Sequence, residues 1–343
     1  MNCPVCGGDC IEDAPALFAR LPHAFAPCPD CMGLTYDKRA PPPDLAPAEP
    51  CPSCEKRFID DVFAQIWTIM ADTGDLSRDD PLAAAGTPLV HPGIALHRPP
   101  YLPPRSLVLL SRSVTEESAR RLVAEVPEIR GVVRNGDGVP GVIDTGTDGN
   151  GRRHTLLAGC DVRADIFDTP AGPIAVYKQQ SVIHIEFPHG QNPKILATYQ
   201  AIRKRSPRTF VDACSGAGTL GLAGGVLGVP AVICNDAWYA AAFWTACNIG
   251  VNREALGVEG VQILHSIADL AERPVATEPV LVAVAEGARD IRVYHGDLRL
   301  LPPLLPDTVD LTAIDLFEKD DREKLKEITQ FWIAAVGGDV FIP

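Results

Sequence analysis

The chain has 343 residues, a formal net charge of −13 and 46% hydrophobic residues. These values are typical of globular proteins with two or three domains and a sizeable core. No apolar run approaches the 18 residues of a membrane span, and the first residues do not resemble a signal peptide, so we expect a cytoplasmic protein without a membrane partner. The negative net charge argues against a protein that coats nucleic acids without specificity. It does not exclude a local basic patch that binds them.

Most of the eleven cysteines lie near the N-terminus, and in a cytoplasmic chain they indicate metal binding rather than disulfides. Three Cys-Pro-x-Cys pairs supply the expected ligands: Cys3, Cys6, Cys28, Cys31, Cys51 and Cys54. Two such pairs complete one tetrahedral Zn²⁺ site. The sequence therefore predicts a zinc ribbon over residues 1–56, in which the metal acts as a folding staple. An iron–sulfur cluster is the alternative.

The spacing of the pairs allows either two neighbouring pairs to share an ion. A proline-rich segment at residues 40–50 separates the third pair from the first two. This favours one site made by Cys3, Cys6, Cys28 and Cys31. Cys51 and Cys54 would then bind a second ion with Cys10, or stay reduced and unligated.

The middle of the chain reads as a helix followed by a small α/β module. Residues 58–70 have helical apolar spacing, and residues 107–134 read as strand, helix and strand. Ser113 and Glu116 have the spacing of a capping box, which predicts a helix that begins at Glu116. Residues 162–186 alternate as paired strands do.

A basic segment follows. Residues 194–208 contain five cations and no acid: Lys194, Arg203, Lys204, Arg205 and Arg208. The segment is either a contact surface for RNA or another acidic substrate, or the solvated face of a helix.

A glycine-rich turn then follows an apolar run that ends at Asp212. Gly216 and Gly218 lack a Cβ, which lets a ligand approach the backbone. The next apolar run ends at Asp236, which is placed to accept hydrogen bonds from ribose hydroxyls. Gly221 also completes the G-x-G-x-x-G of a dinucleotide-binding turn, but the acid before the glycines gives D-x-x-x-G-x-G. The alternative is a parallel-sheet core in which the glycines only turn the chain.

The D-x-x-x-G-x-G pattern resembles motif I of class I S-adenosylmethionine (SAM) methyltransferases. Residues 235–252 are similar to the N-D-x-x-x-x-A…N-x-x-x-N segment of RNA methyltransferases, including tRNA guanine-N2 dimethyltransferases and the wybutosine-pathway and guanine-N1 tRNA enzymes. The turn is also similar to that of rRNA guanine-N2 methyltransferases. The resemblance covers residues 181–343 and implies a doubly wound α/β sheet. It implies SAM binding through Asp212, Gly216, Gly218, Asp236 and Asp297.

In this resemblance Asp297 ends the strand that faces the adenine amine. Asp315 and Phe317 resemble motif IV, which meets the methyl-accepting atom, and they are the candidate catalytic residues. Leu316 stands where amino-methylating enzymes have proline, which leaves N-methylation of a base open. The alternative for Asp315 is that it only caps the helix that follows.

The end of the sequence affects the expected sheet. Residues 337–343 read as its fifth strand, and none follow for the last two strands of a typical class I fold. We expect either that upstream β segments cover this edge or that a partner covers it. Residues 253–290 form a long insertion without an assigned role.

We therefore predict three domains: a zinc ribbon (1–56), a helix with a small α/β module (57–180) and a methyltransferase domain (181–343). The predicted function is SAM-dependent methylation of tRNA or rRNA. Methylation of a protein or a small molecule and a non-catalytic SAM-fold scaffold are the alternatives.

Overall fold

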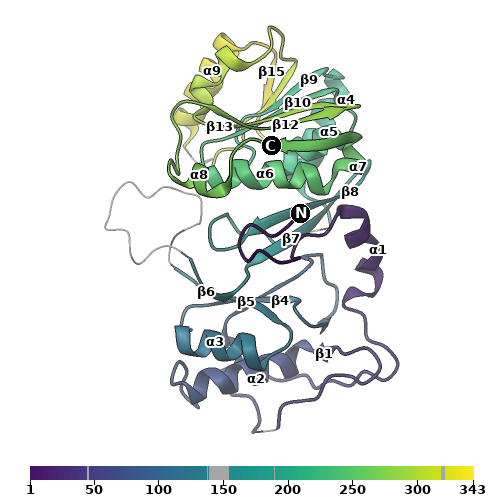
Figure 1. Ribbon diagram of the computed structural model, residues 1–343, viewed down its shortest axis with the longest axis vertical. Coiled ribbons are helices and arrows are strands. Elements are labelled where there is room, and N and C mark those ends of the chain that lie inside the picture. The colour runs from purple at the N-terminus through teal and green to yellow at the C-terminus, as the bar shows by residue number, and fades with distance from the viewer. Residues whose placement is uncertain (45, 137, 139–153, 189, 318–320) are drawn as a thin grey trace. The chain divides into compact units, whose positions relative to one another are not determined.

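The computed structural model (Figure 1) describes residues 1–343 except 45, 137, 139–153, 189 and 318–320. The chain divides into two compact units, which we describe separately. Unit 1 contains Met1–Cys10, Pro15–Asp165 and Gln179–Phe187, and unit 2 contains Ile11–Ala14, Ile166–Lys178 and Pro188–Pro343. The expected boundaries at residues 56 and 180 remain predictions. None of the described helices is long and apolar enough to cross a membrane.

Unit 1 is built on a four-stranded sheet with the strand order β2-β4-β5-β6. Its strands are β2 (Thr87–Val90), β4 (Leu107–Ser111), β5 (Ile129–Arg134) and β6 (Thr155–Gly159). The strands β4 and β5 pair in parallel. The helix α3 (Glu116–Glu125) connects them, which confirms the strand–helix–strand prediction for residues 107–134.

The capping box of α3 lies two residues later than predicted. Thr115, not Ser113, is the N-cap residue, and its partner is Ser118 rather than Glu116. The Thr115 hydroxyl accepts a hydrogen bond from the backbone N–H of Ser118, and the Ser118 hydroxyl accepts one from the backbone N–H of Thr115. A serine can thus take the place of the expected glutamate, and the predicted start of the helix at Glu116 is confirmed.

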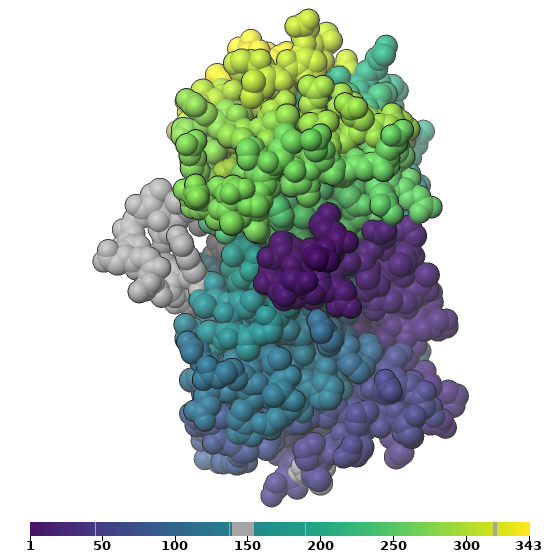
Figure 2. Space-filling view, in the orientation of Figure 1, coloured from purple at the N-terminus to yellow at the C-terminus, as the bar shows by residue number. Residues whose placement is uncertain are grey.

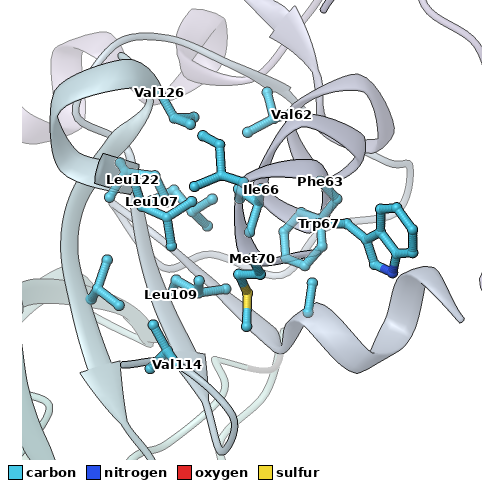
Figure 3. Close-up of a cluster of buried hydrophobic side chains, with 14 of the residues drawn as sticks. Val62, Phe63, Ile66, Trp67, Met70, Leu107, Leu109, Val114, Leu122 and Val126 are labelled. Atoms are coloured by element: carbon cyan, nitrogen blue, oxygen red, sulfur yellow. The ribbon is translucent and has the colours of Figure 1, made fainter. Parts of the chain in front are cut away.

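The core of unit 1 lies between this sheet and α2 (Ile59–Asp72), which confirms the helix predicted at residues 58–70 (Figure 3). Ile66 and Met70 of α2 are fully buried beside Leu107 and Leu109 of β4 and Leu122 of α3. The other elements of this part of the chain are α1 (Ala14–Ala24), the antiparallel pair β1 (Arg57–Phe58) and β3 (Tyr101–Leu102), and the 3₁₀ turn η1 (Leu82–Ala85).

A separate two-stranded sheet joins β7 (Val162–Thr169) to β8 (Gly172–Gln179). This sheet corresponds to the paired strands predicted at residues 162–186.

Unit 2 contains a seven-stranded sheet with the order β11-β12-β13-β10-β9-β14-β15. Five neighbouring strands pair in parallel: β13 (Asp290–His295), β10 (Ala231–Asp236), β9 (Thr209–Asp212), β14 (Leu311–Ala313) and β15 (Asp339–Phe341). Its helices are α4 (Pro193–Arg205), α5 (Thr219–Val226), α6 (Tyr239–Val251), α7 (Arg253–Leu256), α8 (Ile267–Ala271) and α9 (Arg322–Ala335), and η2 (Leu298–Leu300) and η3 (Pro302–Leu304) are 3₁₀ turns. The chain progresses from β9 toward β13 and then returns to the other side of β9. This reversal is that of a doubly wound sheet and confirms the predicted α/β fold.

The insertion at residues 253–290 supplies two strands that the sequence prediction lacked. The strands β11 (Val258–Ile263) and β12 (Val280–Gly287) pair antiparallel with each other and extend the sheet beside β13. The expected cover of the β15 edge by upstream β segments is not found within the described residues, because the additional strands lie at the opposite edge. Within the described residues, β15 pairs only with β14.

Candidate functional site

The glycine-rich turn joins the carboxyl end of β9 to α5. Gly216 and Gly218 have φ angles of 54° and 90°, in the left-handed region that favours glycine. A Cβ on Gly218 would lie 2.9 Å from Thr245 of α6, whereas a Cβ on Gly216 would have no heavy atom within 4 Å. Gly216 thus presents bare backbone to open space, which fits a turn that a ligand approaches closely.

Asp212 lies beneath this turn and is fully buried. Its Oδ2 accepts a hydrogen bond of 2.8 Å from the backbone N–H of Gly221, which ties the first turn of α5 to the end of β9. Burial raises the pKa of Asp212 to about 8, and the nearby carboxyl groups of Asp315 and Asp236 add to the increase. Asp212, Asp236 and Asp315 end or follow neighbouring strands at one end of the sheet.

Asp236 ends β10, the neighbour of β9 on one side. Its Oδ2 accepts a hydrogen bond of 2.8 Å from the backbone N–H of Gly216, and its Oδ1 accepts one of 2.8 Å from that of Trp238. Burial raises the pKa of this carboxyl to about 6. Each oxygen retains a lone pair, so the group can accept further hydrogen bonds from a ligand at Gly216.

Asp297 follows β13, one strand farther from the turn. It caps η2 through the backbone N–H of Arg299 at 2.9 Å, and its carboxylate forms an ion pair with the Arg299 guanidinium. Burial alone would raise the pKa of Asp297, but Arg299 lowers it below the ordinary value. Asp297 is therefore an ionised acceptor with a cationic neighbour, a feature that its position in the sequence did not reveal.

Asp315 follows β14, the neighbour of β9 on the other side. Its Oδ2 lies 2.7 Å from the Nζ atom of Lys194, in the first turn of α4. The side chain of Phe317 is 61% exposed. Asp315 does not cap the helix that follows, because Asp321 is the N-cap residue of α9.

The described acids thus occupy the carboxyl ends of three adjacent parallel strands. Asp236, Asp212 and Asp315 follow or end β10, β9 and β14, respectively, and the order of the strands reverses at β9. In open α/β sheets, ligands bind outside the carboxyl ends of the strands at such a reversal.

The asparagines of the 235–252 segment have structural contacts. Asn248 of α6 and Asn252, which follows the end of α6, each form a pair of hydrogen bonds with the backbone of β8, at Tyr177 and Ala175, respectively. The Nδ2 atom of Asn235 donates to the carbonyl oxygens of Ala213 and Gly296. These side chains therefore fix strands and helices around the turn.

The basic segment does not gather at the carboxyl ends of the strands, as an RNA surface beside the site would require. The helix α4 is about 20 Å long at 1.5 Å per residue, and only Lys194, in its first turn, contacts Asp315. Arg205, in its last turn, forms an ion pair with Asp339 at the start of β15, and the backbone N–H of Arg208 donates to Asp310, just before β14. The cations of the last turn therefore lie at the amino ends of the strands.

The cysteines form two groups that differ from the expected pairing. The ribbon cluster consists of Cys28, Cys31, Cys51 and Cys54, and the corner cluster consists of Cys3, Cys6, Cys10 and Cys160. In each group the four sulfur atoms lie within 4.8 Å of one another. The preferred sharing of one ion by the first two pairs is thus wrong, because α1 separates them and the second pair meets the third.

The ribbon cluster has the geometry that a tetrahedral metal requires. The sulfur atoms of Cys28 and Cys51 lie 3.5 Å apart, and those of Cys31 and Cys54 lie 3.4 Å apart. Four thiolates at 2.3 Å from Zn²⁺ are about 3.8 Å from one another, so a small expansion would accommodate the ion.

No family model and no curated protein matches the chain. Among solved structures, the chain is similar to Trm1 from Pyrococcus horikoshii in complex with S-adenosyl-L-methionine, at 16% identity and a TM-score of 0.37, over 52% of this chain and 42% of that one. It is similar to Trm5b from Pyrococcus abyssi at 12% identity and a TM-score of 0.38, over 74% and 58% of the two chains. It is also similar to TYW2 from Pyrococcus horikoshii in complex with MeSAdo, at 17% identity and a TM-score of 0.35, over 68% and 65%. The chain thus spans less than two thirds of the length of each of these structures.

Proposed function

We propose that the chain is a SAM-dependent methyltransferase. The observation that carries the proposal is that three acids end or follow adjacent strands beside a glycine turn, where the strand order reverses. Gly216 offers open backbone, and Asp236 offers a carboxylate 2.8 Å from the Gly216 nitrogen. A ribose-bearing ligand needs this combination of a close-approach turn and a neighbouring acceptor for its hydroxyl groups.

The acceptor side of the proposed site is the end of β14. SAM, when bound, supplies an electrophilic methyl group on a sulfonium, and the protein mainly has to orient the attacking atom. The ammonium group of Lys194 holds the Asp315 carboxylate in place, so that Asp315 accepts a hydrogen bond from the acceptor. Phe317 offers an exposed ring on which a planar group can stack.

We propose RNA as the acceptor class, and the exposed Phe317 beside Asp315 is the feature that favours it. The distribution of the α4 cations does not support this choice, because only Lys194 contacts a residue of the site. The net charge of −13 favours the alternative of a protein or small-molecule substrate.

We also propose that the ribbon cluster holds one Zn²⁺ ion as a structural staple. All four ligands are cysteines and leave no open coordination position, which is typical of structural rather than catalytic zinc.

The test is transfer of radiolabelled methyl from SAM to total RNA and to total protein, with nuclease and protease digestion to identify the labelled product. We expect calorimetry to show SAM binding and no NAD binding. Asp315→Asn should retain SAM binding and lose transfer, while Asp307→Asn, at an exposed acid, should retain both. Labelled polypeptide would exclude RNA as the acceptor, and absence of SAM binding would exclude the methyltransferase itself.

A further inference from the structure

The corner cluster brings an N-terminal segment to a turn far along the chain. The sulfur atoms of Cys3 and Cys160 lie 3.7 Å apart although the residues are 157 positions apart, and those of Cys6 and Cys10 lie 3.3 Å apart. Cys160 lies between the end of β6 and the start of β7. In Figure 1 the N-terminus runs beside β7, in agreement with this contact.

The N-terminal segment repeats the metal-binding turn of the ribbon cluster. The backbone N–H of Cys3 donates to the carbonyl oxygen of Gly8, and that of Gly7 donates to that of Cys3, both at 2.8 Å. The same two bonds connect Cys51 with Lys56 and Glu55 with Cys51, at 3.0 and 2.8 Å. The fifth residue of each turn is left-handed, with φ of 71° at Gly7 and 60° at Glu55. The two turns therefore present their cysteine pairs in the same way.

The fourth ligand is held rigidly by the sheet of unit 1. The backbone N–H of Cys160 donates to the carbonyl oxygen of Arg130 at 2.7 Å, and a Cβ on Gly131 would lie only 2.3 Å from the Cys160 carbonyl oxygen. Gly159, with φ of 75°, turns the chain just before it. Cys160 is thus fixed before any metal binds, as a strong ligand site requires.

Two arginines lie close to the corner cluster. Arg130 is buried, and within the described residues it forms no ion pair with a carboxylate and its Nε has no hydrogen-bond partner. Two other buried arginines each contact a carboxylate: Arg57 is paired with Glu128, and Arg163 is paired with Asp165. Arg130 accepts the backbone hydrogen bond of Cys160, and the Nη2 atom of Arg105 lies 3.6 Å from the Cys10 sulfur. A buried cation needs an anionic partner, and a Zn²⁺ ion with four thiolates carries two negative charges.

We propose that Cys3, Cys6, Cys10 and Cys160 bind a second Zn²⁺ ion, which staples the N-terminal segment to the corner between β6 and β7. Three of the ligands are buried and Cys6 is exposed. Figure 2 shows the first residues of the chain, in the darkest purple, on the molecular surface, so the ion has an entry path through Cys6.

The zinc content of the full-length chain tests the proposal, by elemental analysis and native mass spectrometry under reducing conditions. We expect two ions in the natural chain, one in Cys160→Ser, one in Cys54→Ser and none in the double variant. Cys247→Ala removes a buried cysteine outside both clusters and should keep two ions. One ion in the natural chain, lost in Cys54→Ser and kept in Cys160→Ser, would overturn the proposal.

Substitution at Cys6 provides a test that does not depend on folding of a core variant, because this residue is exposed. Cys6→His replaces the sulfur ligand with a nitrogen ligand, so this variant should retain two ions. Cys6→Ser should release one ion to a chelator at least about tenfold faster than the natural chain. With Co²⁺ as the probe, the Cys6→His variant should show a visible spectrum with one fewer thiolate than the natural chain. Identical spectra and release rates in all three proteins would exclude Cys6 as a ligand and overturn the four-cysteine site.

Oxidation is the competing chemistry, since the close pairs Cys3–Cys160 and Cys6–Cys10 would also suit two disulfides. Alkylation of the metal-loaded chain should leave Cys10 and Cys160 unmodified, and a chelator should make both reactive. Hydrogen exchange at residues 155–165 should then accelerate about tenfold or more. Metal-loaded Cys54→Ser, which keeps the corner ion, should exchange as slowly there as the metal-loaded natural chain. Cysteines that stay unreactive after chelation and become reactive only after reduction would establish disulfides and refute the zinc site.

Discussion

The two units position their key residues by different physical means. In unit 2 the acids of the candidate site follow adjacent strands, and close contacts such as that of Gly221 with Cys234 set the distance between α5 and β10. In unit 1 two groups of four cysteines join segments that are separate in the sequence. The comparison indicates that unit 2 should respond to changes in packing, and unit 1 to the loss of metal.

The largest effect should follow loss of the corner cluster, because it closes the longer loop. If each ion acts as a crosslink, chain entropy predicts about 5 kcal/mol for the separation of 157 residues between Cys3 and Cys160, against about 3.4 kcal/mol for the 23 residues between Cys28 and Cys51. Cys160→Ser should therefore lower the free energy of unfolding of unit 1 more than Cys54→Ser does. Denaturant titration followed by hydrogen exchange of unit 1 peptides would measure this difference. Equal losses would show that the ions do not act through loop closure.

Unit 2 should instead be sensitive to a single methyl group at Gly221. A Cβ there would lie 2.3 Å from the buried sulfur atom of Cys234, and such overpacking costs about 3 kcal/mol at the upper end of its usual range. Gly260→Ala is the matched control, since its Cβ would meet nothing within 4 Å, and it should change stability by less than about 0.5 kcal/mol. Thermal unfolding of both variants with metal present measures the contrast. A Gly221→Ala variant as stable as the control would show that α5 can move away from β10.

The same contrast explains what the sequence could reveal. The turn at Asp212 and the acid at Asp236 belong to a contiguous motif, so the fold and the placement of these acids at one end of the sheet could be predicted from local spacing. Cys160 stands alone in its part of the chain, and only the pairing of distant strands brings it to Cys3. The expected pairing of cysteines was wrong for the same reason, since spacing alone does not show where α1 directs the chain.

Two other features of unit 2 were also beyond local reasoning. The strands β11 and β12 pair antiparallel at the β13 edge. No motif in residues 253–290 predicts that pairing. Lys194 was grouped with the basic segment by its neighbours in sequence, yet it contacts Asp315 from the end of α4 opposite the other cations. Charge runs in a sequence do not specify a surface when a helix separates their two ends.

A smaller effect is expected at the cofactor site, where Asp236→Ala should weaken SAM binding by about 2 kcal/mol. The substitution removes a partly buried acceptor of ribose hydroxyl groups and leaves the Gly216 and Trp238 N–H groups without their partner. Asp290→Ala is the control, because Asp290 is an exposed acid at the opposite end of the neighbouring strand. Calorimetry at pH 7.5 compares the two variants, and equal affinities would remove Asp236 from the proposed site.

The smallest effect should be a dependence of SAM affinity on pH. This dependence should originate at Asp236 in unit 2 and not at the cysteines of unit 1. Burial raises the pKa of Asp236 to about 6, and ribose hydroxyl groups donate to the ionised carboxylate. Below pH 6 this group must lose its proton before it can accept those bonds, so affinity should fall by up to tenfold, about 1.4 kcal/mol, for each pH unit, and it should be constant above pH 7. Asp236→Asn should bind more weakly at pH 7.5 but without this slope. Calorimetry from pH 5 to pH 8 can measure both proteins, with zinc content followed in parallel because acid also protonates thiolates. A slope that persists in Asp236→Asn would assign the titration to another group, and a slope that follows zinc loss would place its origin in unit 1.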